Sequence, residues 1–173
     1  MDVLAHGLWG AVPFVPGGGR RFGAALMVGM APDVLSFGAF HLLRPDWILS
    51  RIAGEISGPP AIEILPRYVF YAYNVTHSLL VCVAVFLIAS WWLQRPAWIL
   101  APWVIHIACD IPTHATDYFP TPFLWPLETP FVNGRSWARQ GFLVANYSAL
   151  MLAYIMVGIC LWKKRRTANE DRH

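Results

Sequence analysis

Six side chains of metal-ligand type lie in or beside the apolar segments of this chain. Ionisable residues are costly inside a bilayer, so their presence there indicates a functional site. Histidine and aspartate together bind zinc or manganese. The pattern predicts a divalent metal, zinc first and manganese second, held by His6, Asp33, His77, His106 and Asp110, with His114 nearby.

The most informative spacing is the H-x-x-x-D of His106 and Asp110. Residues four apart share one face of a helix, so both side chains can reach one ligand. His114 lies another four residues on, beyond a possible bend at Pro112. A divalent cation would satisfy both residues, and the alternative is a buried His–Asp hydrogen bond.

The other candidates lie near helix-breaking or polar neighbours. Asp33 follows Pro32, which removes a backbone donor and frees a nearby carbonyl; the alternative is a kink with a hydrogen-bonded aspartate. His77 has polar neighbours that can support a metal ligand, namely Asn74, Thr76 and Ser78. Instead of binding a metal, His77 could be a core histidine bonded to a backbone carbonyl. For His6, the alternative role is that of a histidine at the membrane interface.

This set of side chains favours metal-assisted hydrolysis. A coordinated water becomes a strong nucleophile near neutral pH, and the sequence contains no Ser–His–Asp elbow, P-loop or G-x-G-x-x-G motif. The hypothesis is a hydrolase acting on a lipid-like or phosphoester substrate, with His114 or Glu128 assisting proton transfer. Its predicted catalytic residues are Asp33, His77, His106, Asp110 and His114.

The composition indicates that the bilayer is the solvent. Of the 173 residues, 57% are hydrophobic and 13% are charged, whereas soluble domains run near roughly 45–50% and about 25%. The net charge of +3 is too small to favour a nucleic-acid partner. Membrane lipid and a small-molecule or lipid substrate are the predicted partners.

The apolar runs predict an all-α, polytopic membrane bundle of four to five hydrophobic helices. The runs are 22–43, 68–93, 97–114 and 142–162, with the shorter 1–16 as a fifth candidate. Residues 1–162 form a single predicted domain, and residues 163–173 a basic, polar tail. The helical rise places the central His and Asp residues in one layer between the midplane and one face.

The arginines and lysines predict the orientation. Arg20, Arg21, Arg95 and the cluster at 163–166 fall on one side of the predicted bundle. The positive-inside rule makes that side cytoplasmic and places the C-terminus there.

Five motifs resemble, in order, those of the membrane-bound, metal-dependent hydrolases of the bacterial inner membrane. They are MDVLAHG at 1–7, Pro-Asp at 32–33, Thr-His-Ser at 76–78, HIACDIPT at 106–113 and LWPL at 124–127. The resemblance covers about residues 1–127 and implies an inner-membrane protein that depends on a metal; it implies no substrate. Leu35 stands where that family has a second aspartate, Ala5 where it has threonine, and Tyr73-Asn74 where an arginine is common.

A more distant similarity is to the zinc-dependent phospholipases C, which order their ligands in the same way. It implies one zinc on Asp33, His77, His106 and Asp110, and a second on His6 and Asp110. It also implies a phosphoester substrate.

Other functions use the same residues. A transporter, or an ion- or proton-conducting protein, would place them along a path across the bilayer. A haem or quinone protein would use His77 and His106 as axial ligands but leaves the carboxylates unexplained. A purely structural membrane protein is the remaining alternative.

Overall fold

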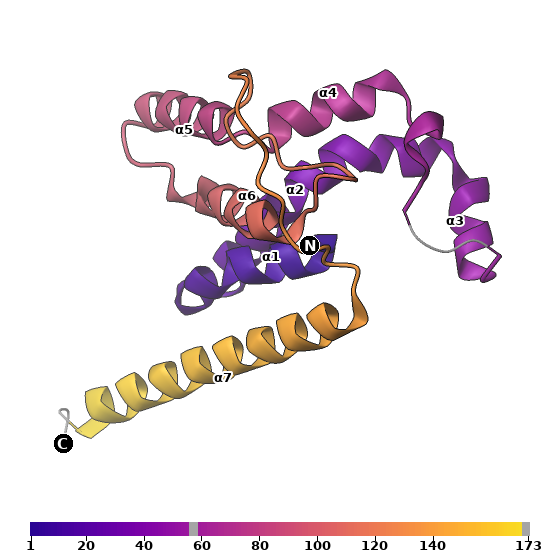
Figure 1. The fold of residues 1–173 in the computed structure, drawn as a ribbon. Helices are drawn as coiled ribbons and strands as arrows, with labels where there is room; N and C mark the ends of the chain where they lie inside the picture. Colours follow the sequence, from indigo (N-terminus) through magenta and orange to yellow (C-terminus); the bar gives the residue numbers. More distant parts are fainter. Residues whose placement is uncertain (56–58, 171–173) are drawn as a thin grey trace.

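The computed structural model describes residues 1–55 and 59–170, and every regular element in them is helical (Figure 1). The all-α prediction is confirmed for this part of the chain. The helices are α1 Val3–Ala11, α2 Gly19–Leu43, α3 Pro45–Ile52, α4 Arg67–Thr76, α5 Leu79–Leu93, α6 Ala101–Thr113 and α7 Gln140–Glu170. Short 3-10 turns lie at Val12–Gly17, Ile62–Ile64 and Trp98–Leu100.

Fewer helices can cross a membrane than the four or five predicted. Among the described residues, two are long and apolar enough, α2 and the Gly141–Glu170 part of α7, and the bent pair α4–α5 raises the number to three. Apolar runs near residue 10 and residue 105 form shorter helices, Val3–Gly17 and Trp98–Thr113. Thirteen helical residues, as in α6, extend only about 20 Å against a hydrocarbon core of roughly 30 Å.

The apolar run 68–93 is not the single helix that its hydropathy predicts. It bends by 62° between α4 and α5. Ser78 has an extended backbone, and its hydroxyl caps α5 by accepting from Val81 N at 3.3 Å. The backbone N–H of Leu79, at the start of α5, donates to Phe123 O at 2.8 Å. A distant loop therefore supplies the hydrogen-bond acceptor that the break in the helix removes. The break places His77 between two helices.

Glycines let α1, α2 and α6 approach closely. A Cβ on Gly29 would lie 2.9 Å from the carbonyl oxygen of His6, and one on Gly10 would lie 2.7 Å from Pro102 Cβ. Backbones can come this near only where a side chain is absent. The contact holds the helix that carries His6 against the helices that carry Asp33 and His106.

The segment 114–139 returns across the end of α6 before α7 begins. Gly134 N donates to His114 O at 2.9 Å, Arg135 N to Pro112 O at 2.9 Å and Trp137 N to Thr113 O at 3.1 Å. These bonds satisfy carbonyls that the helix end leaves without partners. A Cβ on Gly134 would lie 2.3 Å from Pro112 O, so only glycine fits at this position.

We expect Gly134→Ala to lower the free energy of unfolding by about 1–3 kcal/mol. The added methyl group would clash with backbone atoms of Pro112 and His114, which can be relieved only if the loop moves away from α6. Thermal unfolding in detergent measures the effect. Gly141→Ala is the matched control, since a Cβ there meets nothing within 4 Å. Equal melting temperatures for wild type and Gly134→Ala would contradict the packing described.

Helix α7 lies beside α1 at the edge of the other helices (Figure 1). Trp9 Nε1 donates to Asn146 Oδ1 at 2.9 Å, and Tyr154 OH donates to Leu8 O at 2.8 Å. The helix continues past Trp162 to Glu170, through most of the predicted tail; residues 171–173 lie outside the described part.

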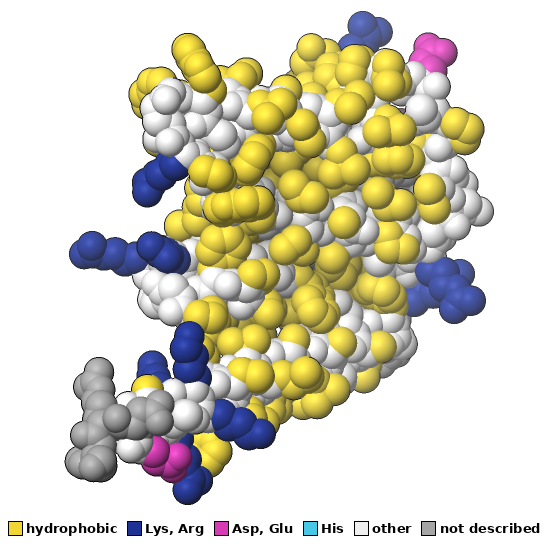
Figure 2. Space-filling model, turned by 90° about the vertical axis from the view of Figure 1, so that its left-hand side faces the viewer, with side chains coloured by type: hydrophobic (Ala, Val, Ile, Leu, Met, Phe, Trp, Pro, Cys, Tyr) yellow, Lys and Arg dark blue, Asp and Glu magenta, His cyan; other side chains and the backbone are white. Residues whose placement is uncertain are grey.

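The surface of the molecule is largely apolar. Met27, Leu87 and Met156 are each at least 60% exposed. Figure 2 shows one face covered mostly by hydrophobic side chains, with Lys and Arg toward its edges. Such a surface fits contact with lipid, and the two long helices support membrane association.

Candidate metal centre

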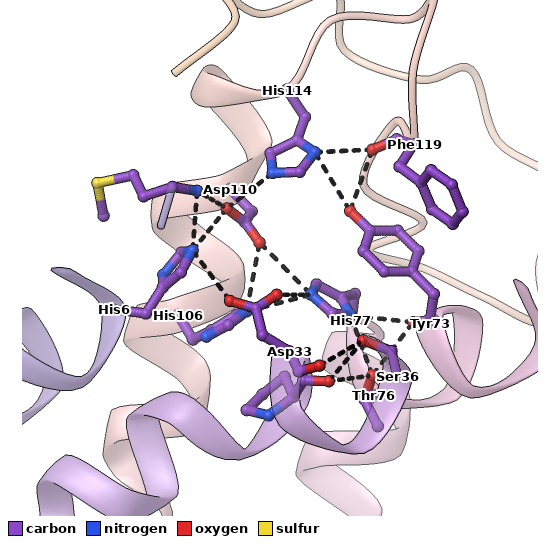
Figure 3. Close-up of polar contacts among 12 residues, drawn as sticks. His6, Asp33, Ser36, Tyr73, Thr76, His77, His106, Asp110, His114 and Phe119 are labelled. Carbon is purple, nitrogen blue, oxygen red and sulfur yellow. Dashed lines mark hydrogen bonds and ion pairs between the residues drawn. The ribbon is translucent and has the colours of Figure 1, made fainter. Parts of the chain in front are cut away.

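Four predicted ligands converge on one point in the interior (Figure 3). Asp33 comes from α2, His77 from the break after α4, and His106 with Asp110 from α6. One ligand atom from each lies within 4.8 Å of all the others. The two histidines and Asp110 are fully buried, and the Asp33 side chain is 14% exposed. These four residues, here called the central group, can hold a metal ion.

The ring of His106 is oriented by a backbone carbonyl. Its Nδ1 lies 2.7 Å from Gly29 O, and because a carbonyl can only accept, Nδ1 carries the proton and donates. Pro32 cannot bond Val28 O, so the helix is already interrupted next to Gly29. A neutral His106 therefore presents the unprotonated Nε2 to the central group.

His77 is oriented in the same way. Its Nδ1 lies 3.1 Å from Tyr73 O and 3.0 Å from the hydroxyl of Thr76. The carbonyl again requires a donor, so a neutral His77 also presents an unprotonated Nε2. That atom lies 3.5 Å from Asp33 Oδ1 and 3.5 Å from Asp110 Oδ2.

The result is a buried set of acceptors facing one another. The Nε2 atoms of His77 and His106 are 3.1 Å apart, and His106 Nε2 lies 3.3 Å from Asp110 Oδ2. Asp33 Oδ2 and Asp110 Oδ2 make no hydrogen bond within the described chain. Lone pairs and carboxylates in this arrangement repel unless a positive charge lies among them. A proton on one ring or a divalent cation shared by all four supplies that charge.

His6 lies on the other side of Asp110. Its Nε2 is 2.9 Å from Asp110 Oδ1, 4.0 Å from Asp33 Oδ2 and 2.8 Å from the Met1 amine. The Met1 amine donates to the same Asp110 oxygen at 2.6 Å. The ring of His6 stacks on that of His106 at 3.7 Å between centroids. His6 therefore borders the central group without being one of its four members.

His114 contacts Asp110 from the segment after α6. Its Nε2 lies 3.2 Å from Asp110 Oδ1, and its Nδ1 donates to Phe119 O at 2.8 Å. The side chain is 13% exposed, so it is partly open to the surroundings. Glu128 is elsewhere: it lines a cavity of about 550 Å³ together with Asn74 and Trp125.

The polar neighbours expected to support His77 have separate roles. Thr76 contacts its ring, whereas Ser78 donates to Trp125 O at 2.6 Å and Asn74 faces the cavity. As the alternative for His77 predicted, its ring bonds a backbone carbonyl, that of Tyr73, whereas the carbonyls of Gly29 and Phe119, which orient His106 and His114, were not predicted. Every residue carries a carbonyl, so no side-chain pattern marks these three.

We expect Thr76→Val to weaken metal affinity about 10-fold, the lower end for loss of a supporting group. The threonine hydroxyl lies 3.0 Å from His77 Nδ1 and 3.3 Å from Pro32 O of α2, and valine keeps its volume. Competition with a chelator of known affinity measures the change. Thr113→Val is the control, because its hydroxyl donates to Cys109 O of its own helix. Equal affinities for the Thr76→Val protein and wild type would contradict this role.

Fold and site together define the class: in its described residues, an all-helical chain with two or three helices that could span a membrane and a buried His–Asp group that can hold a metal ion. Comparisons with protein-family models, curated proteins and solved structures found no match to this chain. The particular activity is therefore argued from the site itself.

Proposed function

We propose that this protein is a membrane-embedded, metal-dependent hydrolase. The observation that carries the proposal is the convergence of four acceptor atoms, two of them histidine nitrogens whose protons are fixed on the opposite side of the ring. Carboxylate oxygens with imidazole nitrogens are ligands typical of zinc, with manganese as the second choice.

Each residue then has a separate role. A bound divalent cation supplies a Lewis acid and lowers the pKa of a coordinated water toward neutrality. Asp33, His77, His106 and Asp110 hold the cation. His114, partly exposed and 3.2 Å from Asp110, is placed to take the proton that the attacking water loses. Glu128, in its separate cavity, is less well placed for this step.

The substrate class that we propose is lipid-like or a phosphoester. Asp33 precedes Leu43, the last residue of α2, by a distance along the helix of roughly 15 Å. That depth supports a central group inside the bilayer, where a lipid is the substrate at hand. The shorter helices α1 and α6 complete the bundle in this arrangement. The cationic cluster after α7 supports a cytoplasmic C-terminus, and the family resemblance supports a bacterial inner membrane as the location.

A second cation belongs to the same proposal. The similarity to zinc-dependent phospholipases C implies it on His6 and Asp110. Asp110 turns Oδ2 to the central group and Oδ1 to His6 and His114, as a bridging carboxylate would. The Met1 amine lies at this position, between His6 Nε2 and Asp110 Oδ1.

The experiment is hydrolysis by the full chain in lipid nanodiscs, loaded with Zn²⁺ or Mn²⁺. The substrates are a phospholipid, a chromogenic phosphodiester, a carboxylic ester and an amide. We expect turnover of a phosphoester that falls at least about a hundredfold in His77→Gln, more than the loss of a supporting group costs. His41→Gln, a histidine of α2 outside the central group, should retain activity.

Two results would contradict the proposal. One is no turnover of any substrate by protein with a stoichiometric metal ion. The other is equal turnover by His77→Gln and wild type, because an activity that does not need His77 does not come from this site.

The second candidate function is transport. The broken pair α4–α5, with His77 at the break, favours it, because interrupted helices carry ion sites in transporters. Flux of Zn²⁺ or protons into liposomes containing the protein, abolished by His77→Gln, would support transport. Tight liposomes with no flux would leave hydrolysis as the sole proposal.

A further inference from the structure

Phe119 has an unusual backbone conformation next to the central group. Its φ of 47° lies in the left-handed region, which a residue with a bulky side chain rarely adopts. Such a conformation persists only where the surroundings enforce it, and these positions often have functional roles. Phe119 is only 7% exposed, and its ring packs on Phe37, Phe70 and Tyr73 at 5.0, 5.1 and 5.0 Å between centroids.

The consequence of this conformation is the position of the Phe119 carbonyl. The oxygen accepts from His114 Nδ1 at 2.8 Å and from Tyr73 OH at 3.1 Å. The first bond keeps the proton of His114 on Nδ1 and leaves Nε2 facing Asp110. The second bond holds the carbonyl from α4, and Tyr73 OH lies 3.4 Å from His114 Nδ1, so the two donors approach the oxygen from neighbouring directions.

Tyr73 also contacts His77. The two rings stack at 3.8 Å between centroids and 23° between planes, and Tyr73 O accepts from His77 Nδ1. The tyrosine is 2% exposed. One residue therefore orients His77 through its ring and carbonyl, and His114 through its hydroxyl and Phe119. Among the polar and ring contacts of the described residues, Asp110 is the other side chain that contacts both histidines.

We propose that Tyr73 is a positioning residue that couples the fold of the segment 114–125 to metal binding. The hydroxyl and the ring make separate contributions. The inference rests on the proposed function only in taking a divalent metal as the species that His77 and Asp110 bind. Without Tyr73, the loop could hold Phe119 in another conformation and His114 would turn from Asp110.

The test compares Tyr73→Phe, which removes only the hydroxyl, with Tyr73→Leu, which also removes the stacked ring. Tyr118→Phe is the matched control. Burial raises the pKa of Tyr118 to about 12, and its hydroxyl donates to Pro60 O at 2.8 Å, so it too fastens this loop but away from the histidines. The full chain in detergent is titrated with Co²⁺, whose visible spectrum reports ligand geometry.

We expect Co²⁺ affinity to fall about 10-fold in Tyr73→Phe and about 100-fold in Tyr73→Leu, the range for loss of groups that orient ligands. The Co²⁺ bands should shift in both, and Tyr118→Phe should match wild type. A purely structural tyrosine would leave the bands of the folded protein unchanged. Affinity and spectrum of Tyr73→Phe equal to those of Tyr118→Phe would overturn the inference.

A second measurement needs no metal. Diethyl pyrocarbonate modifies accessible histidines, and mass spectrometry locates each adduct. In metal-free Tyr73→Phe we expect His114 to react about three- to tenfold faster, the effect of one lost hydrogen bond on local opening, while His41 reacts at the wild-type rate. If wild type binds no Co²⁺, the metal proposal fails, and the modification rate of His114 alone tests the role of Tyr73. Faster modification in Tyr73→Phe would support Tyr73 as a positioning residue, and an unchanged rate would refute that role.

Discussion

Asp110→Asn should abolish metal binding in a protein that still folds. Metal measured by mass spectrometry on detergent-purified protein should fall from a stoichiometric ion to background, with affinity reduced at least about a hundredfold. The two oxygens of Asp110 contact four histidines, at 2.9 to 3.5 Å. Asparagine keeps its shape and removes the negative charge that a cation needs.

The same substitution distinguishes a metal site from a hydrogen-bonded network. If the central group holds a cation, Zn²⁺ should stabilise wild type and leave the stability of Asp110→Asn unchanged, because the variant has lost a ligand. If the histidines are instead protonated and paired with Asp110, Zn²⁺ should leave both proteins unchanged, and Asp110→Asn should be less stable by about 3–5 kcal/mol, because the Met1 amine and the histidines lose their buried partner. Asp46→Asn is the control: this exposed aspartate pairs with Arg44, which lowers the pKa of its carboxyl, and should retain the metal.

Removal of the metal should have the second large effect. Three helices and the break after α4 contribute to or border the central group, so an ion bound there links segments far apart in sequence. Binding to the folded state alone stabilises it by about 2.7 kcal/mol at a free ion concentration a hundred times Kd, and by about 4.1 kcal/mol at a thousand times. The melting temperature should therefore drop on chelation and recover when Zn²⁺ is restored.

Two controls sharpen this expectation. The chelator should not change the melting temperature of Asp110→Asn, because that variant has no ion to lose. Gly134→Ala should melt lower than wild type by the same amount with and without metal, since its defect lies in backbone packing. A wild-type melting temperature that is indifferent to chelator and to added Zn²⁺ would refute a metal bound in the folded state.

Side-chain patterns in the sequence predicted the part of the site that consists of side chains. The spacing of His106 and Asp110 places both on one helix face, and they lie 3.3 Å apart. Asp33 and His77 are ionisable residues in apolar surroundings, which few structural roles explain. His6 and His114 were also predicted as ligand or catalytic residues, and both contact Asp110 of the central group without belonging to its four members.

The parts that could not be predicted depend on backbone geometry. Taken together, α4 and α5 are apolar enough for one span, and a bend leaves the average hydropathy unchanged, so the break at Ser78 was missed. The capping serine was a local signal that could have revealed it. Tyr73 reads as one more aromatic residue in an apolar helix, and its importance comes from Phe119, which is 46 residues away. The number of spanning helices was overestimated for another reason: the apolar runs near residues 10 and 105 form helices too short to cross the hydrocarbon core.

The order in which the residues emerge during synthesis adds a constraint. Asp33 and His77 are synthesised before α6, and Asp110 follows His77 by 33 positions. At about 5–20 residues per second, that interval is roughly 2–7 seconds. During this interval, Asp33 and His77 have no ligand partner from α6. The site is completed only when α6 packs beside them, so a chain that stalls before that helix carries both ionisable side chains without the partners that they have in the folded protein.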